Sequence, residues 1–309
     1  MRPILVLGPP RSGSTWVSEV LASTPGAHLL HEPDSDPNMP FGLLAKAGLG
    51  RYPLLRTGDV ADRYTALWIE ALTPGASRRT QPRFVSRAIL RSTNLDLRNE
   101  ILFAEPTRRA RLVTKSLAAF ARPVGPPAAE HVIVKSVHSG LAAEFITALA
   151  DPIVILVRRN PLNGVASWLE MGWRHQRLGK SVDQERVVGE MVGAAPPSDD
   201  AALDRLHAWS YSALTRALDL EAERSATWVV VQHEELCRDP LNRFAELFER
   251  VGLPWSDEVR RTLEARNDRA TGYTTKRVAA EEPERWRERL DSDQEEMIRD
   301  TAQRLSLSC

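Results

Sequence analysis

The chain has 309 residues, of which 42% are hydrophobic and 27% charged, the balance of an ordinary soluble globular protein. Lysine plus arginine and aspartate plus glutamate both number 41, so the net charge gives no reason to expect binding to nucleic acid or to an anionic membrane. Two distant cysteines, Cys237 and Cys309, exclude a disulfide framework and a zinc cluster and fit a reducing compartment. We find no signal peptide and no apolar run long enough to span a bilayer, which predicts a cytoplasmic enzyme.

The first turn of the chain has the pattern of a phosphate cradle. Residues 4–7 are apolar and predict a buried parallel strand, and Gly8-Pro9-Pro10 ends it. A short loop follows, and residues 14–21 predict an amphipathic helix whose N-terminus points its N–H groups at the loop. Gly8 to Thr15 has the spacing of the nucleotide-triphosphate P-loop, but Ser14 stands where that motif has lysine, and the cation is Arg11. If the match of residues 8–15 to the P-loop pattern stood alone, the alternative would be an ordinary strand–helix turn that binds no phosphate.

The next hundred residues predict a short strand and then an elaboration of the fold. Residues 27–30 read as a strand with His31 and Glu32 at its end, and residues 34–53 as a surface loop or lid rich in Pro, Gly and Asp. Residues 60–72 predict a helix, 77–83 a basic loop, and 84–127 two arginine-rich helices. We interpret residues 34–130 as an insertion that shapes the acceptor pocket; a merely structural insertion is the alternative.

Strands and helices alternate in the remainder. Strands are expected at 131–135, 152–157 and 227–231, and helices at 139–150, 160–172, 183–192, 201–224 and from 240 to Val251. This alternation predicts a single α/β domain over residues 1–309, with a central parallel sheet flanked by helices.

A second anion site is predicted where the apolar strand 152–157 ends. Arg158 and Arg159 follow that strand, and Asn160-Pro161 opens a helix in which Ser167 lies two turns on. The arginine fork matches phosphate geometry, although arginines after a strand often only solvate a sheet edge. Two such sites at one sheet edge would fit one ligand that carries two separated phosphate groups.

These residues resemble the sulfotransferases that use 3′-phosphoadenosine 5′-phosphosulfate (PAPS). Residues 10–16 resemble the family's 5′-phosphosulfate loop, and residues 159–167 its 3′-phosphate motif, with an arginine and a serine eight positions apart. Residues 231–240 are similar to its strand followed by a Tyr-Glu-Asp-Leu type segment. Thr275-Lys276-Arg277, followed by Trp286, resembles its late basic loop. The resemblance implies a sulfotransferase-type α/β fold with a P-loop-like turn.

Three departures place the chain nearer the bacterial and tyrosylprotein-type branch than the cytosolic aryl branch. Arg11 stands where many cytosolic members have lysine, and His233 where tyrosine is frequent. The Lys-x-His pattern of the cytosolic enzymes becomes Lys135-Ser136-Val137-His138, one residue longer.

The resemblance implies transfer of a sulfuryl group from PAPS to a hydroxyl or amine, with PAP as product and no metal. Arg11 would stabilise the leaving phosphate, and Lys135 would assist it or bind phosphate. Glu32 is our first choice for the general base, because tyrosylprotein-type members place a catalytic glutamate at a similar position; His138 is second and His31 third. Cofactor binding is expected from Arg11, Ser12, Gly13, Ser14, Thr15, Trp16, Arg159, Ser167, Lys276 and Arg277.

Two other classes remain as alternatives. A P-loop kinase or related NTPase shares the first turn but needs the missing lysine and a magnesium carboxylate. A non-catalytic module could instead bind an anionic partner through the arginine-rich region 78–122. The sequence identifies neither the acceptor, which could be a small molecule, a sugar or a lipid, nor the oligomeric state.

Overall fold

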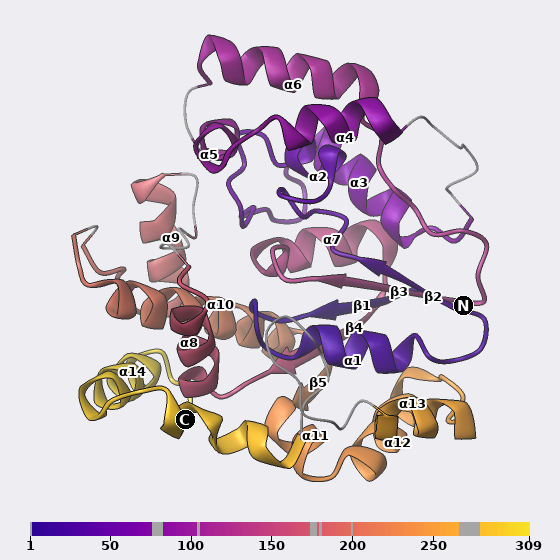
Figure 1. Cartoon of the computed structure of the whole chain (residues 1–309), viewed down its shortest axis with the longest axis vertical. Coiled ribbons are helices and arrows are strands. Elements are labelled where there is room, and N and C mark those ends of the chain that lie inside the picture. Colours follow the sequence, from indigo (N-terminus) through magenta and orange to yellow (C-terminus); the bar gives the residue numbers. More distant parts are fainter. Residues whose placement is uncertain are drawn as a thin grey trace.

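Five parallel strands form one sheet in the order β2-β3-β1-β4-β5 (Figure 1). The strands are β1 (Ile4–Leu7), β2 (Ala27–His31), β3 (His131–Ser136), β4 (Ile153–Arg158) and β5 (Val229–Gln232). Leu7 lies opposite Ser136 on one neighbouring strand and Leu156 on the other. All five strands therefore end at the same edge of the sheet, and the α/β parallel architecture expected from the sequence is confirmed.

The computed structural model describes the greater part of the chain, namely residues 2–75, 83–103, 106–173, 178, 181–198, 200–265 and 279–309. Lys276 and Arg277, predicted to bind the cofactor, lie outside the described residues, as does most of the basic loop expected at 77–83. Within the described residues, no helix has the length and apolar character needed to cross a bilayer.

Helices cover both faces of the sheet because its strands are apolar on both sides. Leu5 and Leu7 face a cluster that includes the helices α3 (Asp62–Leu72) and α7 (Ala143–Ala150). Ile4 and Val6 face the opposite cluster, which packs against α1 (Ser14–Leu21), α12 (Pro240–Val251) and α13 (Asp257–Ala265). Figure 1 shows these two helical layers on either side of the strands.

A third group of helices forms a core of its own. It consists of α8 (Pro161–Glu170), α9 (Val182–Val192), α10 (Leu203–Arg224) and α14 (Ser292–Arg304), which share a core around Trp168 and Tyr211. Three short elements connect larger ones: η1 (Gly140–Ala142), α11 (His233–Arg238) and η2 (Ala279–Glu288). The sequence did not predict α11, which continues directly from β5.

The segment between β2 and β3 differs from its sequence prediction in two ways. Residues 34–53 are not a surface loop: they contain α2 (Pro40–Ala45), and Asp34, Asp36 and Lys46 are buried. The stretch 84–127 contains three helices, not two: α4 (Arg83–Arg91), α5 (Leu95–Phe103) and α6 (Arg108–Phe120). Leucines of α2, α4, α5 and α6 form a separate core, and we call these four helices the helical cap.

Candidate active site

The residues that follow the five strands gather around one cavity of about 1100 Å³. Its wall includes the turn after β1, Glu32 after β2, His138 after β3, Arg159 after β4 and His233 after β5. The carboxyl ends of parallel strands are the usual ligand-binding edge of an α/β sheet. We call the wall around Arg11, Gly13, Trp16, Arg159 and His233 the turn side. The opposite wall, around Asp36, Arg51, Tyr52, Leu95 and Arg98, is the cap side.

The turn after β1 has the backbone of an anion cradle. Arg11 and Gly13 adopt left-handed conformations, with φ of 72° and 92°, and the Ser12 N–H donates to the Pro9 carbonyl over 3.0 Å. A side chain at position 13 would lie 2.1 Å from the His233 ring, so glycine is required there by both φ and space. Among the residues that the structure describes, no side chain caps α1, which leaves the first N–H groups of that helix available to a ligand.

Five of the six predicted loop residues line the cavity, namely Arg11, Gly13, Ser14, Thr15 and Trp16. Ser12 does not: its side chain is fully buried beneath the turn, and its hydroxyl has no hydrogen-bond partner within the described residues. Trp16 packs edge-on against His233 at a ring-centroid distance of 5.9 Å. The loop therefore offers mostly backbone groups and the Arg11 side chain to a ligand.

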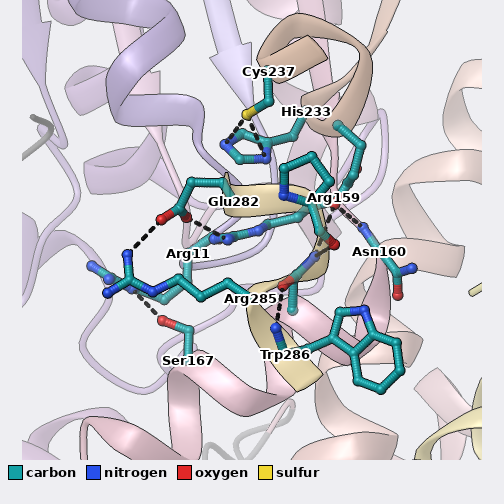
Figure 2. A network of polar contacts seen from close by, with 12 residues as sticks. Arg11, Arg159, Asn160, Ser167, His233, Cys237, Glu282, Arg285 and Trp286 are labelled. Atoms are coloured by element: carbon teal, nitrogen blue, oxygen red, sulfur yellow. Dashed lines mark hydrogen bonds and ion pairs between the residues drawn. The ribbon is translucent and has the colours of Figure 1, made fainter. Parts of the chain in front are cut away.

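The two predicted anion sites are joined by direct hydrogen bonds (Figure 2). Arg159 Nη1 donates to the Arg11 carbonyl over 2.8 Å, and Arg11 Nε donates to Ser167 Oγ over 2.8 Å. The Asn160 side chain caps α8 by accepting from the Leu162 N–H, which fixes the turn that carries Arg159. Ser167 thus contacts Arg11 and is itself buried.

Glu282 is a part of this network that the sequence did not predict. Its carboxylate accepts from Arg159 Nη2 over 3.0 Å and from Arg285 over 2.7 Å, and it is buried on the cavity wall. Asn163 of α8 anchors the segment by donating to the Pro283 carbonyl and accepting from the Trp286 N–H. In sequence, Glu281-Glu282-Pro283-Glu284 looks like a solvated charge run, so only the fold distinguishes its second carboxylate.

Glu32 and Lys135 form an ion pair on the cavity floor. The chain turns sharply at Glu32, where φ is 47°, and its N–H donates to the Lys135 carbonyl over 2.8 Å. The Lys135 ammonium donates to the Glu32 carboxylate. Burial opposes ionisation of this carboxyl, but the charge of Lys135 and its hydrogen bond outweigh it and hold the Glu32 pKa below its usual value. Glu32 is therefore a carboxylate at neutral pH.

The two histidines considered as bases are less basic than usual. Burial, aided by the nearby Lys46, lowers the pKa of His138 to about 3, so this imidazole is neutral. Its Nδ1 has no hydrogen-bond partner within the described part of the chain, and its ring lies edge-on to Tyr52. Burial and the charge of Lys135 also lower the pKa of His31.

Charged side chains of the cap side were missed by sequence reasoning. The fully buried Lys46 ammonium lies 2.9 Å from the Asp36 carboxylate, and Arg51 lies 3.4 Å from its other oxygen. Behind them, Asp34 is fully buried and accepts from Ser136 Oγ over 2.8 Å; burial raises the pKa of this carboxyl to about 6. No motif marks these residues, because each matters only through partners brought close by the fold.

Within the described residues, no group of three or more His, Cys, Asp or Glu side chains is placed to hold a metal ion. The parallel sheet and the glycine-containing turn before α1 define an α/β protein with a P-loop-like phosphate-binding turn.

The model of the sulfotransferase family matches residues 3–257, and the chain belongs to this family. It is accordingly a sulfotransferase enzyme, as the sequence motifs predicted. No curated protein matches the chain.

Three solved sulfotransferase structures are similar to it. The sulfotransferase domain from the curacin biosynthetic pathway is 14% identical, with 99% of this chain and 98% of that chain covered and a TM-score of 0.45. Sulfotransferase STF9 from Mycobacterium avium is 15% identical, with 99% and 77% covered and a TM-score of 0.45. Sulfotransferase STF1 from Mycobacterium tuberculosis is 14% identical, with 97% and 76% covered and a TM-score of 0.43.

Proposed function

We propose that the protein transfers a sulfuryl group from PAPS to a hydroxyl or amine of an acceptor. The observation that carries the proposal is the hydrogen bond between Arg159 and the Arg11 carbonyl, which joins two anion-binding turns at one end of one cavity. A ligand with two separated phosphate groups can engage both turns. PAPS has this property and belongs to the chemistry of the family.

The residues of the turn side fit such a ligand. The N-terminus of α1, which carries no side-chain cap among the described residues, favours negative charge. Arg159 Nε is buried and, within the described residues, has no hydrogen-bond partner. Ser14 supplies no cation for a γ-phosphate, which disfavours a nucleoside triphosphate.

PAPS supplies a sulfuryl group whose S–O bond to a phosphate is broken in the reaction. In our proposal Arg11 and the N–H groups of the α1 turn stabilise the charge that develops on the departing phosphate. Glu32 accepts the proton of the acceptor hydroxyl as the acceptor oxygen bonds to sulfur. Lys135 holds the Glu32 carboxylate in place and offers its charge to the transferred group.

Charge state and hydrogen bonding favour Glu32 over His138 as the base. Both line the cavity, but Glu32 is ionised and fixed by Lys135, whereas His138 has a pKa of about 3. A cavity of about 1100 Å³ is larger than a nucleotide alone requires, so the cap side is the proposed place for the acceptor.

The proposal is tested by ligand-dependent thermal stability followed by transfer from labelled PAPS. PAP should raise the unfolding temperature more than ATP with magnesium, since a ligand that binds only the folded state stabilises it. A larger shift with ATP and magnesium would favour the NTPase alternative. No shift with either nucleotide, together with salt-dependent binding to heparin, would favour the non-catalytic module.

A further inference from the structure

We propose that the cap side of the cavity contains an anion-binding subsite centred on Arg98, so that the acceptor carries a negatively charged carboxylate or phosphate group besides its nucleophile. This inference rests on the proposed function, because it concerns the acceptor of that reaction. It goes further by assigning a chemical class to that acceptor.

Among the described residues, the partners that hold Arg98 in place are all neutral. Its Nε donates to Thr93 Oγ1 over 2.8 Å, and its Nη2 donates to the Thr93 carbonyl over 3.1 Å and the Leu90 carbonyl over 3.5 Å. Within the described residues no carboxylate pairs with this guanidinium, and no hydrogen bond involves its Nη1. The side chain is partly buried and lines the cavity.

A guanidinium fixed in this way is preorganised for an anion. The three hydrogen bonds restrict its rotamers before any ligand arrives, so little side-chain entropy remains to be lost on binding. Its charge lies at a partly buried wall, where attraction to an anion is stronger than at an open surface. The bonds to the end of α4 explain its orientation, but they leave its charge without a counterion among the described residues.

A second arginine of the cavity wall contacts the residue that follows Arg98 in α5. Arg51 Nη2 donates to the side chain of Asn99, the residue after Arg98, over 3.2 Å, and Arg51 also lines the cavity. Its carboxylate partner Asp36 is shared with Lys46, which lies closer. The cap side therefore presents two arginine side chains from neighbouring positions of the fold.

The remaining wall suits an amphipathic molecule. Tyr52 is buried, lines the cavity, and has a hydroxyl with no hydrogen-bond partner in the described part of the chain. Burying such a group unpaired costs free energy, so a polar ligand atom is favoured there. Leu95 and Trp173 add apolar surface. An acceptor with an apolar body and one anionic group matches this combination.

The test uses matched aromatic probes that differ in charge, titrated by calorimetry into the full chain saturated with PAP. The pairs are 2-naphthoate with 2-naphthamide, and 2-naphthyl phosphate with 2-naphthol. We expect each anion to bind about tenfold or more tightly than its neutral partner, the ratio expected for a charge-assisted hydrogen bond. A larger ratio of affinities for the naphthoate pair indicates a carboxylate subsite, and a larger ratio for the naphthyl phosphate pair indicates a phosphate subsite.

Three variants locate the effect. In Arg98→Gln the preference for the anion should disappear. In Arg98→Lys the preference should be reduced, because lysine keeps the positive charge but lacks the planar guanidinium that binds an anion through two N–H groups. Arg91→Gln, an exposed arginine of the same helical cap, should keep the wild-type ratio. The unfolding temperatures of all three variants show whether each is folded. If Arg98→Gln is not folded, Arg98→Lys serves as the test.

Equal affinities for anion and neutral probe in the wild type, or an unchanged ratio in Arg98→Gln, would overturn the subsite. Failure of both anions to bind at millimolar concentration would also overturn it. PAP binding is recorded first, so failure of the proposed function is seen separately. If PAP does not bind, the probes are titrated without it, and the same ratios decide about Arg98.

Discussion

The two sides of the cavity are built in different ways. The turn side is made of short chain segments at strand ends, and its groups are backbone N–H donors and the arginines within the turns. The cap side is made of side chains that meet across long stretches of sequence, such as Arg51 and Asn99. The first can be recognised as a motif, whereas the second exists only once the chain is folded.

The largest effect is expected where the two sides meet, at Glu32. Glu32→Gln should lower turnover by about 10²–10⁴-fold, the range for loss of a general base, while PAP affinity is retained. Steady-state kinetics with an identified acceptor, together with PAP calorimetry, measures both. If Glu32→Gln keeps near wild-type turnover while His138→Ala abolishes it, the base is His138 instead.

The next effect concerns stability of the cap side. Asp36→Asn removes the carboxylate from the buried Lys46 and should lower the free energy of unfolding by about 3–5 kcal/mol, as for one partner of a buried ion pair. Asp151→Asn is the matched control, because its pair with Arg2 is exposed and should contribute at most about 1 kcal/mol. Chemical denaturation compares the two. Equal losses would show that the Asp36 cluster does not stabilise the cap side.

Asp34 should make stability depend on pH. Its pKa in the folded protein is about 6, above the ordinary value of 3.8, so the folded state favours the protonated form. The stabilisation that the raised pKa of Asp34 gives the folded state is complete below pH 3.8. It is lost as the pH rises through about 6. Its full size is on the order of 3 kcal/mol.

Chemical denaturation of the wild type and Asp34→Asn from pH 4 to 8 isolates the contribution of Asp34 to the free energy of unfolding. The stability of the wild type relative to the variant should fall across that range. Asp96→Asn, an exposed aspartate, is the control for a general effect of removing a charge. A pH-independent difference between wild type and Asp34→Asn would exclude a perturbed Asp34.

The smallest effect is expected at Glu282 on the turn side. Its carboxylate occupies one edge of the Arg159 fork and would repel a phosphate bound beside it. Glu282→Gln should therefore bind PAP about 5–10-fold more tightly, or about 1 kcal/mol. Glu284→Gln changes an exposed glutamate of the same segment and should have no effect. Weaker PAP binding in Glu282→Gln would mean that this carboxylate orients Arg159 rather than competing with phosphate.

The contrast between the sides also explains what the sequence could predict. Continuous apolar runs such as residues 4–7 and 153–157 identify buried parallel strands, and the turns after them identify the anion sites. The local sequence indicates a tight turn at Gly13. It does not indicate the contact between Gly13 and His233, because the two residues are 220 positions apart. Lys46 and Asp36 are buried although their polarity suggested a surface loop. Their ion pair, together with the contacts of both to Arg51, compensates for the loss of water.

The most direct test of the account is calorimetric titration of PAP and of adenosine 5′-phosphate, which lacks the 3′-phosphate. The wild type should bind PAP more tightly, and Arg159→Ala should weaken PAP binding by about 1.5–3 kcal/mol. It should weaken adenosine 5′-phosphate binding by less, because that ligand loses only the support that Arg159 gives to the Arg11 turn. Arg158→Ala, whose side chain pairs with Asp219, should bind PAP like the wild type. Equal affinities for the two nucleotides, or an Arg159→Ala variant that binds PAP normally, would contradict the joint anion site.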